Sequence, residues 1–381
     1  MKWRELWRGA KSVPDGGGVP ARRVPDWLAG TRASGGFVQG YEAQLAAVVL
    51  TNPVGHRAMK LVAGALGGLV IDVEAEQDEE AISALVRGEG FLETLAMHLL
   101  LHGNAYAQAV AGDGDAPAQL VVLRPERVSV LTDAEGWPSG YVYRVGGKAR
   151  RIAARDGLER SQVAHVRTSH PRGDHYGLGC LDAAIAPASV HNAAAKWNQA
   201  LLDNAARPSG ALVHKSEDGA PLTDAQFERL KSELAEQYAG SVNAGRPLLL
   251  EGDLDWRALS MSPQDMDFVA LKEAAARDIA LAFGVPPVLL GLPGDATYSN
   301  GQEAGRALYR QTVLPMARHV LSCLATMLSD WVGPVRLSVD EDQLSELMAD
   351  RSLLWAALKD ADFLTEGEKR EMLGFPRERP E

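Results

Sequence analysis

The chain has 381 residues, of which 46% are hydrophobic and 23% charged, a composition typical of a folded protein with more than one module. Its 50 acidic and 39 basic side chains give a net charge of -11, which argues against a protein that grips nucleic acid phosphates firmly. The two cysteines, Cys180 and Cys323, supply neither a disulfide framework nor a zinc-site spacing, and a reducing compartment suits them. We find no signal peptide and no apolar run long enough to cross a bilayer, so we expect no membrane partner.

The first half of the chain predicts an arm, two helices and a group of short strands. Residues 1–36 are rich in glycine, proline and arginine, which is typical of a flexible arm. Apolar spacing predicts helices over 53–69 and 89–102, and Gly103 and Asn104 should end the second. Short apolar runs separated by turn signals predict strands at 70–73, 120–123, 128–131, 141–145 and 163–166.

Two long amphipathic helices are predicted in the second half, each roughly 30 Å long at 1.5 Å per residue. The first runs over 187–206, with Pro187 in its first turn. The second runs over 264–283 and ends at the sequence Gly284-Val285-Pro286-Pro287. Each carries an apolar stripe that a small subunit cannot cover alone, which favours neighbours in a ring. The stripes consist of Val190, Ala194, Trp197 and Leu201, and of Phe268, Leu271, Ala275, Ile279 and Ala282.

A small α/β insert is predicted between these two helices, with a strand at 211–214, a helix over 223–238 and a strand at 247–250. A third long helix should run from Gly301 to Val332 with a kink at Pro315. A final helical piece over 343–373 closes the chain.

Two weak patterns keep an enzymatic alternative open. His98 and His102 are four residues apart on one helix, as a metal pair would be, but no third ligand stands nearby in sequence. Cys180 follows a loop that holds His170 and His175, so a thiol site is conceivable. Glycine-rich phosphate loops and the usual hydrolase motifs are absent from the sequence. We therefore expect no catalytic residue, no cofactor and no metal.

Several short motifs then occur in a recognisable order. The most specific is Asp278-Ile279-Ala280 followed by Phe283-Gly284-Val285-Pro286-Pro287, with Leu290-Gly291 after it. Others are Gly103-Asn104-Ala105-Tyr106, Pro208-Ser209-Gly210, Ala296-Thr297-Tyr298-Ser299-Asn300, Leu314-Pro315 and Leu364-Thr365 with Leu373-Gly374. Together they resemble the portal protein family of tailed phages, in the branch typified by the HK97 phage, from about Phe37 to Pro376. Gly177-Leu178-Gly179-Cys180-Leu181 and Gly367 depart from the family pattern.

The resemblance implies an α+β portal protein fold with a wing, a two-helix stem, a small α/β clip, a tunnel loop and a short helical crown, assembled as a ring. The implied segments are a flexible arm over 1–36, the wing over 37–185, stem helices over 186–207 and 259–288, the clip over 208–258, the tunnel loop over 289–300, a kinked wing helix and strand over 301–345, and the crown over 346–381.

The resemblance also implies a role. The chain would form a ring of twelve subunits at one capsid vertex, through which double-stranded DNA is packaged and ejected. Its partners would be the terminase large subunit, the head-tail adaptor and the major capsid protein, in a virion assembled in the host cytoplasm. A phage and a gene transfer agent would use the same portal, and a different ring-forming head adaptor is the other alternative. The implied DNA-facing residues are Asp295, Thr297, Tyr298, Ser299 and Asn300, and the implied stem contacts are Trp197, Leu201, Phe268, Leu271 and Ile279.

Overall fold

The computed structural model places Val38–Glu381 in one compact unit. It describes residues 40–112, 117–203, 210–214, 223–229, 232, 254–258, 268–292, 298–359, 361 and 363–372. The predicted arm over 1–36 and the predicted strand over 247–250 lie outside these residues. None of the helices in the described part is long and apolar enough to cross a membrane.

The main hydrophobic core is built by helices around a two-stranded sheet. Asn52 caps the first long helix, and Pro53 at its first position has no N–H that would need a partner. Strands β1 and β10 are antiparallel, with Ile71 opposite Val339. The elements here are α2 (Tyr41–Leu45), the π-helical turn η1 (Ala46–Leu50), α3 (Pro53–Gly67), β1 (Ile71–Ala75), α4 (Glu79–Val86), α5 (Phe91–His102), α10 (Leu314–Val332) and β10 (Val335–Val339).

Two three-stranded antiparallel sheets form the β-rich part, in the orders β3-β2-β7 and β4-β5-β6. A second core cluster draws one residue from each of the six strands: Tyr106, Leu123, Val128, Tyr141, Ile152 and Val163. The strands are β2 (Asn104–Ala111), β3 (Pro117–Leu123), β4 (Val128–Thr132), β5 (Pro138–Val145), β6 (Lys148–Ala153) and β7 (Val163–Arg167), and the 3-10 turn η2 (Pro125–Arg127) joins β3 to β4. The strands expected here are confirmed; β2 and β6 are additional.

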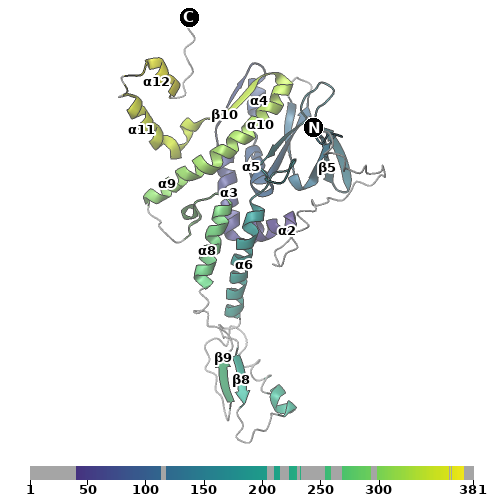
Figure 1. Cartoon of the computed structure of the whole chain (residues 1–381), viewed down its shortest axis with the longest axis vertical. Coiled ribbons are helices and arrows are strands. Elements are labelled where there is room, and N and C mark those ends of the chain that lie inside the picture. The colour runs from purple at the N-terminus through teal and green to yellow at the C-terminus, as the bar shows by residue number, and fades with distance from the viewer. Residues whose placement is uncertain are drawn as a thin grey trace, which may run out of the picture. The chain divides into compact units, whose positions relative to one another are not determined.

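Helices α6 (Leu181–Asp203) and α8 (Phe268–Ala282) confirm the predicted pair, and they pack against each other (Figure 1). The prediction that Pro187 lies in the first turn is wrong, because α6 begins six residues earlier, at Leu181. Burial of Leu181, Ala184 and Ile185 in the core offsets the hydrogen bond that proline cannot donate.

The insert between these helices contains a hairpin. Strand β8 (Gly210–His214) confirms the first predicted strand and pairs with β9 (Leu254–Ala258), which was not predicted. Residues 224–229 are helical, inside the helix predicted over 223–238.

The third long helix is present in two parts, α9 (Tyr298–Leu308) and α10, joined by the π-helical turn η5 (Tyr309–Val313). A kink was predicted at Pro315; the structure has a π-helical turn that ends at Val313, ahead of this proline. Proline has no N–H and its ring crowds the carbonyl four residues before it, so a wider turn just ahead relieves that contact. The chain ends in the short turns η6 (Glu341–Gln343) and η7 (Ser345–Leu347) and in helices α11 (Met348–Lys359) and α12 (Glu366–Met372).

Candidate functional site

The buried surface of the α6–α8 pair consists largely of alanines, which allow two helices to approach closely. Ala194 on α6 and Ala275 on α8 are 3% and 4% exposed. Ile279 is fully buried and belongs to the main core of its own chain. The prediction that Ile279 contacts a neighbouring subunit is therefore wrong, because no part of its side chain is left for a second chain.

Other apolar residues on the same two helices remain exposed. Trp197 is 43% exposed and Leu271 46%, as predicted residues of a contact surface should be in an isolated subunit. Val269 and Leu281 on α8 are exposed as well, at 68% and 78%. The side chains of the other two predicted contact residues, Leu201 and Phe268, lie outside the described part of the structure. We call the exposed residues Val190, Trp197, Val269, Leu271 and Leu281 the stem surface.

A buried polar contact ties α6 to the start of α3. The side-chain oxygen of Asn52 accepts hydrogen bonds from the backbone N–H groups of Val54 and Gly55, at 3.0 and 3.2 Å. Its amide nitrogen donates to the side chain of Asn192 at 2.9 Å and lies 3.2 Å from Nδ1 of His191. Asn52 is 1% exposed, so water cannot reach its side chain. These hydrogen bonds therefore satisfy polar groups that would otherwise be buried without a partner.

The two α6 residues in this contact are held from other sides too. Asn192 donates from its side chain to the carbonyl oxygen of Ala47 in η1, at 2.8 Å. Burial and then the nearby charge of Lys272 on α8 lower the pKa of His191, which favours its neutral ring. The contact therefore joins α6 to both η1 and α3.

The C-terminal end of α8 is closed by a Schellman motif. Gly284 has φ +65°, and its N–H bonds the carbonyl of Leu281 while the N–H of Val285 bonds that of Ala280. The hydroxyl of Thr312 in η5 donates to the carbonyl oxygen of Gly284 at 2.7 Å. The π-helical turn thus holds the point where α8 stops.

The segment that follows was predicted as a loop over 289–300. The 3-10 turn η4 (Pro287–Leu290) packs against α8, α9 and α3, and Gly291 closes it with φ +70°. Tyr298, Ser299 and Asn300 form the first turn of α9, so placing them in a loop is wrong; the helix begins three residues before Gly301. Asp295 and Thr297 lie outside the described residues. Structured elements thus precede and follow residues 293–297.

A second polar junction lies at the end of α5, centred on Asn104. The Asn104 side-chain oxygen lies 3.1 Å from Nε2 of His165 and accepts the N–H of Gly177 at 2.9 Å. Its nitrogen lies 3.1 Å from Nδ1 of His102. His165 stacks on Tyr106 with ring centroids 4.3 Å apart. Burial, and then the charge of Arg167, lower the pKa of His165 to about 3.

The loop after β7 passes directly against this junction. A Cβ atom on Gly177 would lie 2.0 Å from the carbonyl oxygen of Gly103, so only glycine fits there. Thr168 holds the same stretch, since its hydroxyl donates to the carbonyl oxygen of Leu178 at 2.7 Å. The asparagine and glycines in this part of the sequence therefore fasten β2 and β7 to the loop that leads into α6.

The candidate metal pair is not assembled as a binding site. Burial and then the charge of Arg124 lower the pKa of His98 to about 4, and its Nδ1 atom has no hydrogen-bond partner in the described structure. The ring of His102 packs edge-on against Tyr41, 4.8 Å between centroids. Within the described residues, no three His, Cys, Asp or Glu side chains are grouped so as to hold a metal ion.

The surroundings of the candidate thiol, Cys180, disfavour the thiolate form that a nucleophile needs. Burial raises the pKa of Cys180 well above its ordinary value, so the unreactive thiol form dominates. The Nδ1 atom of His170, in the preceding loop, accepts the N–H of Arg172 at 3.0 Å. These contacts suit a structural loop better than a Cys-His pair.

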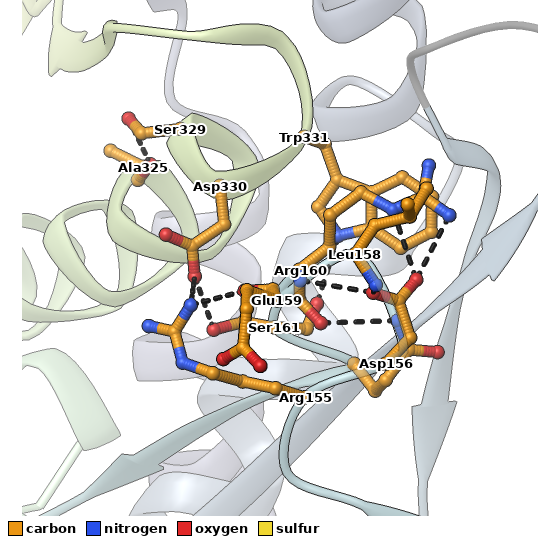
Figure 2. A network of polar contacts seen from close by, with 11 residues as sticks. Arg155, Asp156, Leu158, Glu159, Arg160, Ser161, Ala325, Ser329, Asp330 and Trp331 are labelled. Atoms are coloured by element: carbon orange, nitrogen blue, oxygen red, sulfur yellow. Dashed lines mark hydrogen bonds and ion pairs between the residues drawn. The ribbon is translucent and has the colours of Figure 1, made fainter.

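Figure 2 shows a third polar junction, between the β6–β7 connection and the end of α10. Arg155 pairs with Asp330 at 3.1 Å, and the Asp330 carboxylate also accepts the hydroxyl of Ser161. The indole N–H of Trp331 donates to the carbonyl oxygen of Ser161 at 2.8 Å. The guanidinium of Arg160 lies 4.1 Å from the centre of the Trp331 ring. The β-rich part is thereby fixed to the helix that continues α9.

Comparison with known proteins shows to which protein family the chain belongs. The family model described as phage portal protein matches residues 53–374. The chain belongs to the phage portal protein family. A solved chain from the neck of a native gene transfer agent particle, computed with C12 symmetry, is 43% identical to this portal protein, with a TM-score of 0.68 over 92% of this chain and 99% of that one.

Curated proteins of two kinds are similar to the chain. A protein of Rickettsia bellii is 41% identical over 76% of this chain and 74% of its own length. The portal protein of Enterobacteria phage HK97 is 26% identical over 53% of this chain and 44% of its own length. The α+β portal fold expected from the motifs is thus confirmed.

The polar junctions of this portal protein were not predicted from the sequence, although signals for one were present. Asparagine before proline at the start of an apolar helical run is a capping signal, and Asn52-Pro53 has that form. The His191-Asn192 pair interrupts an otherwise small and apolar helix, which marks a buried polar contact. Nothing in the sequence marks Thr312 as the partner of Gly284.

Proposed function

We propose that this portal chain forms a closed ring of twelve subunits, which serves as the channel for double-stranded DNA at one vertex of a virion. The neck of the similar gene transfer agent particle was computed with twelvefold symmetry, which supports the number. Head-to-tail contacts between identical chains close into a ring when the rotation between neighbours divides a full turn.

The stem surface carries this proposal. Five large apolar side chains are exposed on the two helices, besides the alanines through which the helices pack, and exposed apolar surface of this kind supports a contact with another chain. A neighbouring subunit is the partner that repeats around a ring. The same helices would then line the channel with their remaining polar positions.

DNA would pass without being gripped. The 50 acidic side chains outnumber the 39 basic ones, so a sliding duplex would be held only weakly. We place residues 293–297 with the first turn of α9 nearest to the DNA, because η4 and α9 can hold their positions while this short connection contacts the duplex.

The other partners follow from the same assignment. The insert over 208–258 would dock the terminase motor and later the head-tail adaptor, and the β-rich part would contact the major capsid protein. The sequence contains no phosphate-binding loop, so a separate terminase would supply the energy of packaging, and this chain would catalyse no reaction. Assembly would take place in the host cytoplasm.

Negative-stain electron microscopy of the purified chain, with symmetry analysis of end-on views, tests the proposal directly. We expect rings with a central channel and one subunit number in the majority of particles. A monodisperse monomer in light scattering at micromolar concentration, under several salt conditions, would contradict it. ATP hydrolysis at an enzymatic rate by the motor-free ring would contradict the absence of catalysis.

A further inference from the structure

Two strand edges of opposite charge are exposed on this chain. Strand β1 pairs with β10 on one side, and no described strand pairs with its other side. Asp72 and Glu74 alternate with the inward-facing residues of β1 and are exposed. Four more exposed carboxylates follow within six residues. We call this set the acidic edge: Asp72, Glu74, Glu76, Asp78, Glu79 and Glu80.

The second edge is basic. Strand β6 is the outer strand of the sheet β4-β5-β6, and among the described strands it pairs with β5 alone. Lys148, Arg150 and Arg151 are exposed on it, and Arg144 lies on the neighbouring strand β5, one residue before the last. The sequence from Gly136 to Arg155 contains no acidic residue. We call these four cations the basic edge.

The two edges do not neutralise each other within one chain. No ion pair of the described residues joins them; Glu74 pairs with Arg336 at 3.8 Å, and Arg150 donates to Gln108. Lys148 and Arg151 have no charged partner in the described structure, and neither do five of the six carboxylates of the acidic edge. Each edge therefore keeps a net charge that is available for ion pairs with a second molecule.

From this complementarity we infer that the acidic edge of one subunit contacts the basic edge of its neighbour in the ring. Like charges oppose the two symmetric pairings, acidic with acidic and basic with basic, which would give a two-fold dimer. Opposite charges favour the head-to-tail pairing, which continues from subunit to subunit. The inference rests on the proposed ring and adds to the stem surface a second contact that selects the direction of assembly.

The exposed cations of the basic edge could have two other roles, and each predicts a different outcome of the charge-exchange experiment described below. Charged side chains on outer strands also prevent aggregation, and in that case they need no partner. Cations can bind DNA phosphates, and in that case the acidic edge would be irrelevant. A neighbouring subunit is favoured because the same chain carries the complementary edge, and twelve copies present both edges in equal number.

The test is an exchange of charges between the edges. One variant carries Lys148→Glu, Arg150→Glu and Arg151→Glu; a second carries Asp72→Lys, Glu74→Lys and Glu76→Lys; a third carries all six changes. A matched control reverses three cations of α11 and α12, with Lys359→Glu, Lys369→Glu and Arg370→Glu. Circular dichroism melts confirm that each variant is folded.

Ring assembly is then followed by light scattering against subunit concentration, at low and high salt. We expect each three-residue variant to raise the concentration for half-assembly about tenfold, because several exposed pairs of modest strength act together. The six-residue variant should assemble better than the Lys148/Arg150/Arg151 variant, because its acidic edge is neutralised and no longer repels the reversed basic edge. The α11–α12 control should assemble like the parent. High salt should raise the concentration for half-assembly of the parent. It should also reduce the difference in this concentration between the parent and the three-residue variants.

The inference is overturned if both three-residue variants assemble like the parent, or if the six-residue variant assembles no better than the Lys148/Arg150/Arg151 variant. It is also overturned if reversal of the basic edge reduces DNA retention in a filter assay while assembly is unchanged. A parent that forms no ring would instead contradict the proposed function itself, so the two failures are distinguishable.

Discussion

The hydroxyl of Thr312 donates a 2.7 Å hydrogen bond to the carbonyl oxygen of Gly284, and this bond joins the end of α8 to the π-helical turn before α10. Gly284 is in the left-handed region that glycine favours, with φ +65°. A helix expected to reach the channel is therefore fastened to one that crosses the main core. Movement of either would require this contact to break.

The first prediction concerns Gly284→Ala. A Cβ atom there would lie 2.9 Å from the Thr312 hydroxyl oxygen, in addition to the cost of about 1–2 kcal/mol for a side chain in the left-handed region. Gly291→Ala is the matched control, because Gly291 has φ +70° and open space around its Cβ position. Urea unfolding should show a larger loss of stability for Gly284→Ala. Equal losses would mean that Thr312 does not constrain the end of α8.

The second prediction concerns the buried cap of α3. Asn52→Ala removes the acceptor for two backbone N–H groups and the donor to Asn192, and should lower the free energy of unfolding by about 2–3 kcal/mol. Asn52→Ser keeps an oxygen that can cap the helix but cannot reach Asn192, so its loss should be intermediate. Thermal melts of the three proteins check this order. If serine and alanine are equally destabilising, the contact with α6 matters more than the cap.

The third prediction concerns pH and His98. Burial lowers the pKa of His98 to about 4 in the folded chain, below the ordinary value of 6.5. Above 6.5 the ring is neutral in both states and pH has no effect through this group. Between 6.5 and 4 only the unfolded chain binds the proton, so stability falls as pH falls. The loss by pH 4 is on the order of 3 kcal/mol at most.

His98→Leu should reduce this acid sensitivity. Leucine has a similar size and removes both the titrating group and the buried Nδ1 atom that has no partner in the described structure. We expect the variant to be at least as stable as the parent at pH 7.5 and more stable at pH 5, by urea unfolding. A parent and variant with parallel pH profiles would show that His98 titrates normally.

The sequence was sufficient for most of the fold, for reasons that the structure makes clear. Helices such as α3 and α5 bury apolar residues at regular spacing, and that spacing is visible without any partner. Pro187 misled the prediction because its local preference for a first turn is weaker than the burial of Leu181, Ala184 and Ile185 before it. Strand β6 was missed since it has one buried position among exposed cations.

The functional site was less predictable, because it depends on contacts between distant segments. The sequence placed Leu271 and Ile279 on one apolar stripe of α8, but it could not tell which of these residues are buried within the chain and which are exposed. Ile279 turned out to be core and Leu271 exposed. The start of α9 at Tyr298 was missed because Tyr298, Ser299 and Asn300 precede a glycine and have weak helical preference.

The fourth prediction concerns the stem surface. Trp197→Asp should weaken ring assembly, because it places an uncompensated charge where we expect a neighbour to cover the indole. Ala195→Asp is the control, since Ala195 is exposed on another side of α6 and the change in charge is the same. We expect Ala195→Asp to form rings and Trp197→Asp to remain as dissociated subunits. The melting curve of the Trp197→Asp subunit should match that of the dissociated parent subunit, which would show that the variant is folded. If both variants form rings, Trp197 does not lie in the contact between neighbouring subunits.

The last prediction concerns residues 293–297, between η4 and α9. Replacing these five residues with a Gly-Ser linker of the same length leaves Tyr298 and the rest of α9 unchanged. The anchors on both sides, Gly291 and the first turn of α9, also remain. Ring assembly should therefore be intact by electron microscopy.

DNA packaging or retention should nevertheless be impaired, because the replaced residues are those that we place against the duplex, where polar groups position DNA through its phosphates. Nuclease protection of packaged DNA measures the effect, and a Gly-Ser replacement of residues 113–116, between β2 and β3, is the control. Particles that package and retain DNA like the parent would make the segment a passive connector. A variant that fails to form rings would make it part of the subunit contact, because the replacement would then have removed a contact between neighbouring chains.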